Sequence, residues 1–391
     1  MKQAVILAAG EGQRLRPFTV NRPKAMIAIA DKPIVQYVIE SLAQNGIRNI
    51  VLVVGYRKEQ VYDYFGSGEQ LGVDITYVTQ EDQLGTADAL ARSKALTDEE
   101  FLVLPGDNLI EANTIAQFIT VKPEAVLVKR VPNPVRYGVV SIERGRMKCI
   151  EEKPREAGSN IANTGIYTFT KGIFDFIEPE LDIPDVLNNM IAHGQTINTL
   201  ETVDAWLDVV YPWDILTLND AVLAQMQASS GGTIERGVSI TGQVSIGKDT
   251  IIRSNSYIVG PVVIGKGCDI GPNACLFPAT SIGNNVVVSS FTGIKNSVIG
   301  NDVSIGAGGI IQDSVIDRGC VVKERFTASS GQVEVGTNGE YYPVEIGAMI
   351  GEGCHLDSNV VAQPGVIVGN YSQIKTQKAI NGKLPDRSLV F

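Results

Sequence analysis

A six-residue repeat constrains this 391-residue chain more than any other feature of its sequence. From Ile234 a large aliphatic residue recurs at every sixth position as far as Ile294. After two shorter steps the ladder continues to Val322, and it resumes from Val344 to Ile374. Glycine and other small residues recur between these positions, where a coiled chain would turn corners. The pattern is typical of a parallel β-helix, in which three six-residue faces close each coil and point aliphatic side chains inward.

The sequence before the repeat has a different pattern. Apolar runs that predict buried strands occur at 5–8, 50–54, 75–78, 101–104 and 125–128, and helical patterns occur at 34–43, 87–95 and 211–227. Residues 137–169 indicate several strands without a helix. Strands that alternate with helices predict a Rossmann-like α/β domain with a mixed, mainly parallel sheet.

These two patterns predict two domains. We expect the α/β domain over residues 1–230 and a left-handed β-helix over residues 231–391, joined by a short hinge at 229–232. A polar, glycine-rich break near residues 327–343 predicts a loop that leaves the coil.

Composition excludes several classes of function. Two histidines, and five widely spaced cysteines without a CxxC pair, disfavour a multi-histidine zinc site or a disulfide scaffold. A net charge of −10 without a basic run disfavours binding to nucleic acid. The chain has neither a signal-peptide pattern nor a run of about 20 apolar residues, so we expect a cytoplasmic protein that does not enter membranes.

A glycine-bearing loop follows the first expected strand. It reads Leu7-Ala-Ala-Gly-Glu-Gly-Gln-Arg-Leu-Arg-Pro, and Arg22-Pro-Lys follows shortly after. Glycines let backbone amides approach phosphate oxygens, and Arg14 and Lys24 add positive charge nearby. The GKS or GKT of a P-loop is absent, and Leu15 stands where a dinucleotide fingerprint needs a small residue. The two glycines alone are equally compatible with a plain strand-to-helix turn.

The wider spacing is more specific. G-x-G-x-R-L-x-P, with P-K ten residues after the arginine, resembles the sugar-1-phosphate nucleotidylyltransferases. With the hexapeptide tail, the layout resembles the bifunctional N-acetylglucosamine-1-phosphate uridylyltransferase/glucosamine-1-phosphate acetyltransferases and their archaeal sugar-nucleotide relatives. The resemblance implies that a sugar 1-phosphate attacks the α-phosphate of a nucleoside triphosphate, which gives an NDP-sugar and pyrophosphate.

The resemblance also assigns roles in the first loop. It implies that Arg14 binds the triphosphate and that Lys24 neutralises charge near the transferred α-phosphate. The nucleotide-binding positions implied in the same loop are Leu7, Ala9, Gly10 and Gly12.

Two aspartates form the expected metal site. Asp107, in Leu-Pro-Gly-Asp, comes just after an expected buried strand, where ligands lie in open α/β sheets. A short acidic side chain there suits Mg²⁺ held jointly with phosphates. The resemblance implies that Asp208, in Ala-Trp-Leu-Asp, completes this site, so that Arg14, Lys24, Asp107 and Asp208 form the catalytic set.

Other motifs resemble the substrate-binding segments of the same family. Gln80-Glu-Asp-Gln-Leu-Gly-Thr matches the base-recognition segment, and a Gln amide can both donate and accept, as a pyrimidine edge requires. The implied base contacts are Gln80, Gly85 and Thr86, and Thr86 is also expected to open a helix as a possible cap. The implied sugar and sugar-phosphate contacts are Gly138, Glu152, Lys153 and Asn163. Gln-Leu-Gly-Thr resembles enzymes that use UTP and Pro-Gly-Asp-Asn those that use dTTP, so both bases stay open.

The tail departs from the acetyltransferase pattern. Ala307, Ile310 and Ser330 stand where the resemblance places the catalytic His, Tyr and Asn of the acetyltransferase half. His355 is the only histidine of the tail, and we expect it to be a surface residue. We therefore expect the tail to serve assembly into a trimer, or a multiple of it, rather than acetyl transfer. A bifunctional enzyme that also acetylates an amino sugar 1-phosphate and a non-catalytic regulatory subunit remain the alternatives.

Overall fold

The computed structural model describes residues 1–337 and 340–391 and groups them by contacts into two compact units. The first unit comprises Met1–Glu11, Asn21–Met26 and Pro33–Asp208. The second comprises Gly12–Val20, Ile27–Lys32 and Val209–Phe391. Two short segments near the N-terminus thus group with the repeats. A single boundary at residue 230 therefore does not separate these two units.

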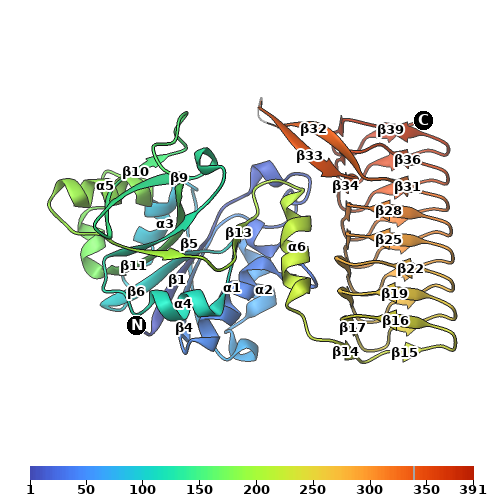
Figure 1. Ribbon diagram of the computed structural model, residues 1–391, viewed down its shortest axis with the longest axis horizontal. Coiled ribbons are helices and arrows are strands. Elements are labelled where there is room, and N and C mark those ends of the chain that lie inside the picture. The colour runs from blue at the N-terminus through green and yellow to red at the C-terminus, as the bar shows by residue number, and fades with distance from the viewer. Residues whose placement is uncertain (338–339) are drawn as a thin grey trace. The chain divides into compact units, whose positions relative to one another are not determined.

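The first unit is built on a mixed sheet (Figure 1). The strands in spatial order are β5 (Asp74–Thr79), β4 (Asn49–Val54), β1 (Gln3–Ala8), β6 (Glu100–Pro105), β11 (Ile161–Thr170), β8 (Ala125–Arg130), β12 (Asn198–Thr202), β10 (Arg146–Glu152) and β9 (Gly138–Glu143). The first four are parallel, and β11 runs antiparallel to β6. The expected strands and the expected helix-free stretch at 137–169 are confirmed.

Helices cover both faces of this sheet. They are α1 (Ile34–Gln44), α2 (Lys58–Phe65), α3 (Thr86–Ala91), α4 (Ala112–Phe118) and α5 (Ile183–Ala192). Alternate residues of β1 enter two separate cores: Ile6 packs with Ile39 of α1, and Val5 packs with Leu187 of α5. The expected helix at 87–95 ends early, because the backbone N–H and the hydroxyl of Ser93 both donate to Leu90 O and close its last turn.

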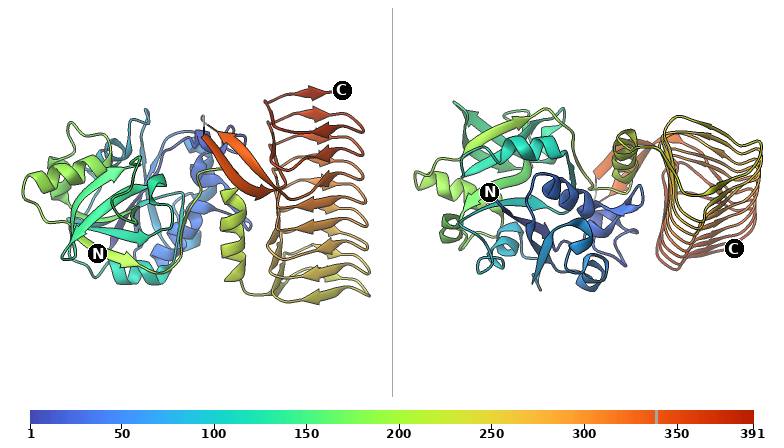
Figure 2. Two further views of the ribbon diagram at one scale, coloured as in Figure 1. Left: turned by 45° about the horizontal axis from the view of Figure 1, so that its top comes forward. Right: turned by 90° about the horizontal axis from the view of Figure 1, so that it is seen from below.

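The repeats of the second unit fold into the expected left-handed parallel β-helix, whose three-sided coils are seen in Figure 2. One sheet holds β14 (Ser229–Ser230), β17 (Val244–Ile246), β20 (Val262–Ile264), β23 (Thr280–Ile282), β26 (Val298–Ile299), β29 (Val315–Ile316), β34 (Ala348–Ile350), β37 (Val366–Val368) and β40 (Lys383–Leu384). The second holds β15 (Thr233–Ile234), β18 (Ile251–Ile252), β21 (Asp269–Ile270), β24 (Val287–Val288), β27 (Ser304–Ile305), β30 (Val321–Val322), β35 (His355–Leu356), β38 (Gln373–Ile374) and β41 (Leu389–Val390). The third holds β16 (Ser239–Thr241), β19 (Tyr257–Val259), β22 (Cys275–Leu276), β25 (Gly293–Lys295), β28 (Ile310–Gln312), β31 (Thr327–Ala328), β36 (Val361–Ala362) and β39 (Ala379–Ile380).

Most of the aliphatic ladder of the sequence forms the core of the β-helix. Three of its expected members do not: Ile234 and Ile240 are exposed on the first coil, and Val344 lies in an antiparallel pair outside the coil, so the ladder resumes at Ile350. Ile264 pairs with Ile282, and Ile282 pairs with Ile299, so a step of five in the sequence shortens one coil without breaking the register. These inward side chains are at most 1% exposed.

Two expectations at the edges of the β-helix need correction. Ser229–Ser230 is not a hinge but strand β14, because Ser229 already pairs with Ser245 in the next coil. The expected loop near 327–343 begins as coil strand β31 and continues as an antiparallel hairpin of β32 (Gly331–Thr337) and β33 (Glu340–Ile346). Val333 lies opposite Val344, and such cross-strand β-branched pairs stabilise a hairpin.

A single helix, α6 (Asp214–Ala224), packs on the β-helix within the second unit. Its Asn219 is fully buried and donates from Nδ2 to Ala279 O (2.9 Å) at a coil corner. Asn219 Oδ1 accepts the N–H of Ala30 (3.2 Å), so one side chain joins the segment Ile27–Lys32 to the coil. Within the described ranges, no helix is long and apolar enough to cross a membrane.

Candidate active site

The expected nucleotide-binding residues of the first unit gather where four parallel strands end. β1, β4 and β5 end in register, and β6 ends beside Leu7 of β1. The loops that follow these strands carry Ala9 and Gly10, Gly55, Gln80, and Asp107. Ligands of open α/β sheets bind at this edge, outside the carboxyl ends of the strands.

Gln80 is buried directly after β5, with 3% of its surface exposed. Its Nε2 donates to Gly85 O (3.0 Å) and to Asp88 Oδ2 (2.8 Å), so it fixes the course of the base-recognition segment. A Cβ at Gly55 would lie 2.8 Å from Gln80 O and 2.9 Å from Ala9 O. Gly55, which the sequence analysis did not single out, is therefore required for the close approach of these loops.

Gly85 and Thr86 contact the residues at the start of helix α5. A Cβ at Gly85 would collide with Leu181 O. Thr86 begins α3, but contrary to expectation its side chain does not cap that helix. Instead Asp182 Oδ1 accepts the N–H of Thr86 (2.9 Å), and Thr86 Oγ1 accepts the N–H of Ile183 (2.9 Å) at the start of α5. Sequence reasoning missed Asp182, because it lies 96 positions from Thr86.

The two expected metal ligands lie at the ends of two paired strands. Asp107 directly precedes β7 (Asn108–Ile110), and Asp208 ends β13 (Trp206–Asp208). The two strands pair antiparallel, with Asp208 opposite Asn108. Lys24 forms an ion pair with Asp107 Oδ2, and the hydroxyl of Tyr137 donates to Asp208 Oδ1 (3.2 Å). Three of the four expected catalytic residues are thus brought together, with Tyr137 as a further contact that no motif spacing indicates.

The expected sugar-binding residues meet on three adjacent strands. Gly138 lies opposite Glu152 in the β9–β10 pair, and a Cβ at Gly138 would lie 2.9 Å from Glu152 Oε2. Lys153 follows Glu152, and their side chains form an ion pair (3.2 Å). Asn163 lies on β11, which pairs with β9 at the preceding residue.

Asn163 is held in a fixed orientation. Its Nδ2 donates to the Tyr167 hydroxyl (2.7 Å), and its Oδ1 accepts the N–H of Gly165 (3.0 Å). Burial raises the pKa of Tyr167, so its phenol stays protonated at neutral pH. These bonds occupy both ends of the Asn163 amide, which thereby shapes the bulge between Asn163 and Tyr167.

Gly12 and Arg14 lie on a segment that the contacts assign to the second unit. Gly12 has φ +72°, a left-handed conformation that favours glycine, and directly precedes the short 3₁₀ helix Gln13–Leu15. Arg14 is exposed, whereas its neighbour Leu15 is fully buried. The segment therefore presents the guanidinium to solvent from an anchored backbone.

Comparison with known proteins agrees with this geometry. A profile of the Nucleotidyl transferase family matches residues 3–225, which is more than half of the chain. The chain belongs to the nucleotidyl transferase family. A profile described as the GMPPB C-terminal domain matches residues 258–336 of this nucleotidyltransferase, within the β-helix.

Individual relatives indicate which kind of nucleotidyl transfer the family member catalyses. The nucleotidyltransferase is 34% identical over 407 residues to the bifunctional protein GlmU of Methanococcus maripaludis, covering 99% of this chain and 97% of the relative. It is 32% identical over 333 residues to a glucose-1-phosphate thymidylyltransferase of Streptomyces antibioticus, covering 78% and 93%. A solved structure from Bacillus anthracis, described as a glucose-1-phosphate thymidylyltransferase, has a TM-score of 0.53 at 28% identity, covering 58% and 97%. The chain is thus a sugar-1-phosphate nucleotidylyltransferase, a transferase that makes NDP-sugars.

The donor set of the nucleotidyltransferase fits a divalent metal, which enzymes of this family generally use. Asp107 and Asp208 offer carboxylate oxygens, and the described residues contain no larger group of His, Cys, Asp or Glu that could hold a metal. Two carboxylates are too few to enclose an ion alone. They suit an ion that takes its remaining ligands from phosphates and water.

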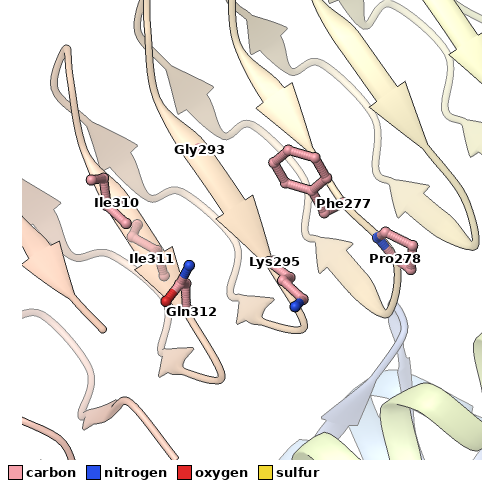
Figure 3. A pocket seen from close by; sticks show the side chains of 7 residues that line it. All are labelled: Phe277, Pro278, Gly293, Lys295, Ile310, Ile311 and Gln312. Atoms are coloured by element: carbon pink, nitrogen blue, oxygen red, sulfur yellow. The ribbon is translucent and has the colours of Figure 1, made fainter. Parts of the chain in front are cut away.

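A hollow lies on the outer face of the β-helix, away from the residues described so far, and is shown in Figure 3. Its walls come from β22, β25 and β28 and include Phe277, Pro278, Ile310 and Gln312. Lys295 is the one titratable side chain among the described residues that line it. Ile310, where the acetyltransferase pattern requires Tyr, has its apolar side chain in this hollow. Apart from Lys295 and Gln312, the side chains that line the hollow are apolar.

Substitution of Gly10 is expected to weaken nucleotide binding without changing the stability of the fold. A Cβ at Gly10 would meet nothing within 4 Å, so Gly10→Ala is expected to leave the melting temperature unchanged. If phosphate oxygens bind against this backbone, the added methyl group is expected to raise the KM for the nucleoside triphosphate about tenfold. Steady-state kinetics with each substrate varied in turn would test this, and an unchanged nucleotide KM would contradict it.

Proposed function

We propose that this nucleotidyltransferase joins a sugar 1-phosphate to UTP or dTTP in the presence of Mg²⁺ and releases pyrophosphate. The observation that carries the proposal is the pairing of β7 with β13, in which Asp208 lies opposite Asn108, the residue that follows Asp107. Asp107 in turn forms an ion pair with Lys24. Two acids and a cation at the carboxyl edge of a parallel sheet suit the transfer of a charged phosphoryl group.

In the proposed reaction, an oxygen of the sugar 1-phosphate forms a bond to the α-phosphorus. The bond from that phosphorus to the pyrophosphate oxygen breaks as pyrophosphate leaves. The nucleophile is already an anion, so positioning and charge stabilisation are required rather than a strong base. Lys24 neutralises charge near the α-phosphate, and Arg14 binds the triphosphate. Asp107 and Asp208 would hold Mg²⁺, which would supply further positive charge to the phosphates.

The remaining residues bind the two ends of the substrates. In this proposal the backbone of the first loop, namely Leu7, Ala9, Gly10 and Gly12, binds the nucleotide. Gln80, Gly85 and Thr86 form the base site, which the Gln80–Gly85 and Thr86–Asp182 hydrogen bonds keep in shape. Gly138, Glu152, Lys153 and Asn163 bind the sugar and its phosphate, and their position on three adjacent strands supports this assignment.

The proposal is tested by pyrophosphate release with Mg²⁺, with UTP and dTTP each crossed with glucose 1-phosphate and N-acetylglucosamine 1-phosphate. Rapid release with at least one pair is expected, and the best pair identifies the base and the sugar. Omission of Mg²⁺ with excess chelator is expected to abolish release. Silence of the folded protein with all four pairs would contradict the proposal and favour a regulatory subunit.

The name of a relative from Sulfurisphaera tokodaii, a bifunctional sugar-1-phosphate nucleotidylyltransferase/acetyltransferase, raises acetyl transfer as a second candidate function. His355 is the only histidine of the tail, and its Nε2 lies 3.5 Å from Asp357 Oδ1, a carboxylate that also pairs with Lys323 and Lys375. The catalytic His, Tyr and Asn of the acetyltransferase pattern are replaced by Ala307, Ile310 and Ser330. We propose that the tail lacks this activity. Transfer of acetyl groups from acetyl-CoA to glucosamine 1-phosphate above the blank rate would contradict this.

We further propose that the protein is a cytoplasmic homo-oligomer, a trimer or a multiple of it. One outer sheet of the β-helix carries half-exposed apolar side chains in a single column, namely Tyr257 (44% exposed), Ile310 (47%) and Val361 (43%), with Cys275, Gly293 and Thr327 on the coils between them. Burial of such a column against other copies would remove it from water. Light scattering after gel filtration is expected to give at least three times 42.0 kDa, and a monomer mass would refute the proposal.

A further inference from the structure

The segment that carries Arg14 is closed by a hydrogen bond between residues near its two ends. The hydroxyl of Thr19, a fully buried residue, donates to Gly12 O (2.7 Å) and closes the segment Gly12–Val20 upon itself. The 3₁₀ helix with Arg14 and the proline Pro17 lie within this closed loop. A displacement of Pro17 would therefore be passed on to Arg14.

This loop is tied to the C-terminal part of the β-helix. Asn370 Nδ2 donates to Pro17 O (3.0 Å), and the two residues are 353 positions apart in the chain. Asn370 is 1% exposed. A Cβ at Gly351, one coil earlier, would lie 3.0 Å from Pro17 Cβ, so the proline ring also packs directly on the coil backbone. All of these contacts lie within the second compact unit.

Asn370 also has a role in the coil, and this role can be separated from the contact with Pro17. Its Oδ1 accepts the N–H of Glu352 (2.7 Å) in the preceding coil. At the same position of another repeat, Asn301 Oδ1 accepts the N–H of Asn284 (2.8 Å), and Asn301 is exposed. In the next coil Asp386 Oδ1 accepts the N–H of Asn370 (2.7 Å), so an aspartate can maintain this ladder. The side-chain oxygen at this position thus stabilises the stacking of the coils. The Asn370 NH₂ group instead holds the loop that carries Arg14, through Pro17 O.

We propose that Asn370 is a positioning residue for nucleotide binding, and that the β-helix takes part in nucleotidyl transfer by fixing the Arg14 loop through Pro17. This inference rests on the proposed function, in which Arg14 binds the triphosphate.

The test compares Asn370→Asp with the matched control Asn301→Asp. Both changes keep the acceptor oxygen of the ladder and replace NH₂ by oxygen, but only the first removes the donor to Pro17 O and sets a carboxylate against it. Asn370→Asp is expected to raise the KM for the nucleoside triphosphate about tenfold, since one buried hydrogen bond to a carbonyl is lost. The KM for the sugar 1-phosphate is expected to stay within about twofold of wild type. Asn301→Asp is expected to match wild type in both constants.

A second pair, Asn370→Ala and Asn301→Ala, brings no charge into the coil and carries the test if Asn370→Asp does not fold. Unchanged nucleotide KM in a folded residue-370 variant would overturn the proposal. Equal effects of the 370 and 301 changes, or a parallel rise of both KM values together with a lower melting temperature, would also overturn it, because they indicate a structural role only. If wild type releases no pyrophosphate with any pair, the proposed function fails first. Calorimetric measurement of UTP and dTTP binding to wild type and to Asn370→Asp then still tests whether the Asn370–Pro17 hydrogen bond supports nucleotide binding. Weaker binding by Asn370→Asp is expected, and equal affinities would refute the proposal.

Discussion

Asp107→Asn is expected to fold normally and to lose at least about a thousandfold in the rate of pyrophosphate release, which corresponds to about 4 kcal/mol of transition-state stabilisation. The amide cannot supply the negative charge that a divalent cation requires. It also leaves Lys24, which pairs with Asp107 Oδ2, without its carboxylate partner. Initial rates with the best substrate pair of the four, at saturating Mg²⁺, would measure the loss.

Asp63→Asn is the matched control for this change. Asp63 lies on α2 in the same compact unit, is exposed, and is outside the proposed site. Its rate is expected to stay within about twofold of wild type. If Asp107→Asn retained more than a tenth of the wild-type rate, Asp107 would not be a metal ligand, and the assignment of the Asp107–Asp208 site would be wrong.

Asn219→Ala is expected to cause a large loss of stability although Asn219 lies outside the active site. Asn219 is fully buried and bonds both Ala279 O and the N–H of Ala30. Alanine would leave a buried carbonyl and a buried amide without partners, which costs about 3 kcal/mol in the free energy of unfolding. Because the second unit has more than 150 residues, the midpoint of thermal unfolding is expected to fall by about 5 °C or more.

Asn113→Ala provides the comparison for this stability change. Asn113 is also helical, but it is exposed on α4, and its Nδ2 donates to Asp204 at the surface (3.1 Å). Its melting temperature is expected to stay within about 1 °C of wild type. A melting temperature of Asn219→Ala equal to that of Asn113→Ala would show that α6 does not secure the segment Ile27–Lys32.

The β-helix could be predicted almost residue by residue, because its period is written directly in the sequence. Each sixth residue from Ile246 to Ile294 is buried in the core, and even the steps of five between Ile294 and Ile316 correspond to shortened coils. The hairpin of β32 and β33 could not be predicted in the same way. Its alternating valines lie in a polar, glycine-rich stretch that breaks the six-residue period, so the stretch was interpreted as a loop.

The position of the candidate site followed from the order of strands and motifs. Buried strands that end in register place Gly10, Gln80 and Asp107 at one edge, and this could be inferred from periodicity alone. The role of Asp208 came from a resemblance, and the pairing of β13 with β7 supports its place in the site.

The contacts that shape the site were not predictable from one sequence. Tyr137 bonds Asp208 and Thr86 bonds Asp182, and each pair is separated by at least 71 positions. A hydrogen bond between two single residues leaves no period and no local spacing to detect. The grouping of Gly12–Val20 with the repeats escaped prediction for the same reason, since it depends on contacts such as that of Pro17 with Asn370.

The bond between Pro17 and Asn370 has a consequence for the order of events during synthesis. After a ribosome has added Pro17, it must add 353 further residues before the partner of that proline exists. Until then the loop that carries Arg14 lacks the donor to Pro17 O. If nucleotide binding depends on this bond as proposed, full affinity would be reached only after the late coils have wound, and a chain cut short before residue 370 would bind nucleotide more weakly.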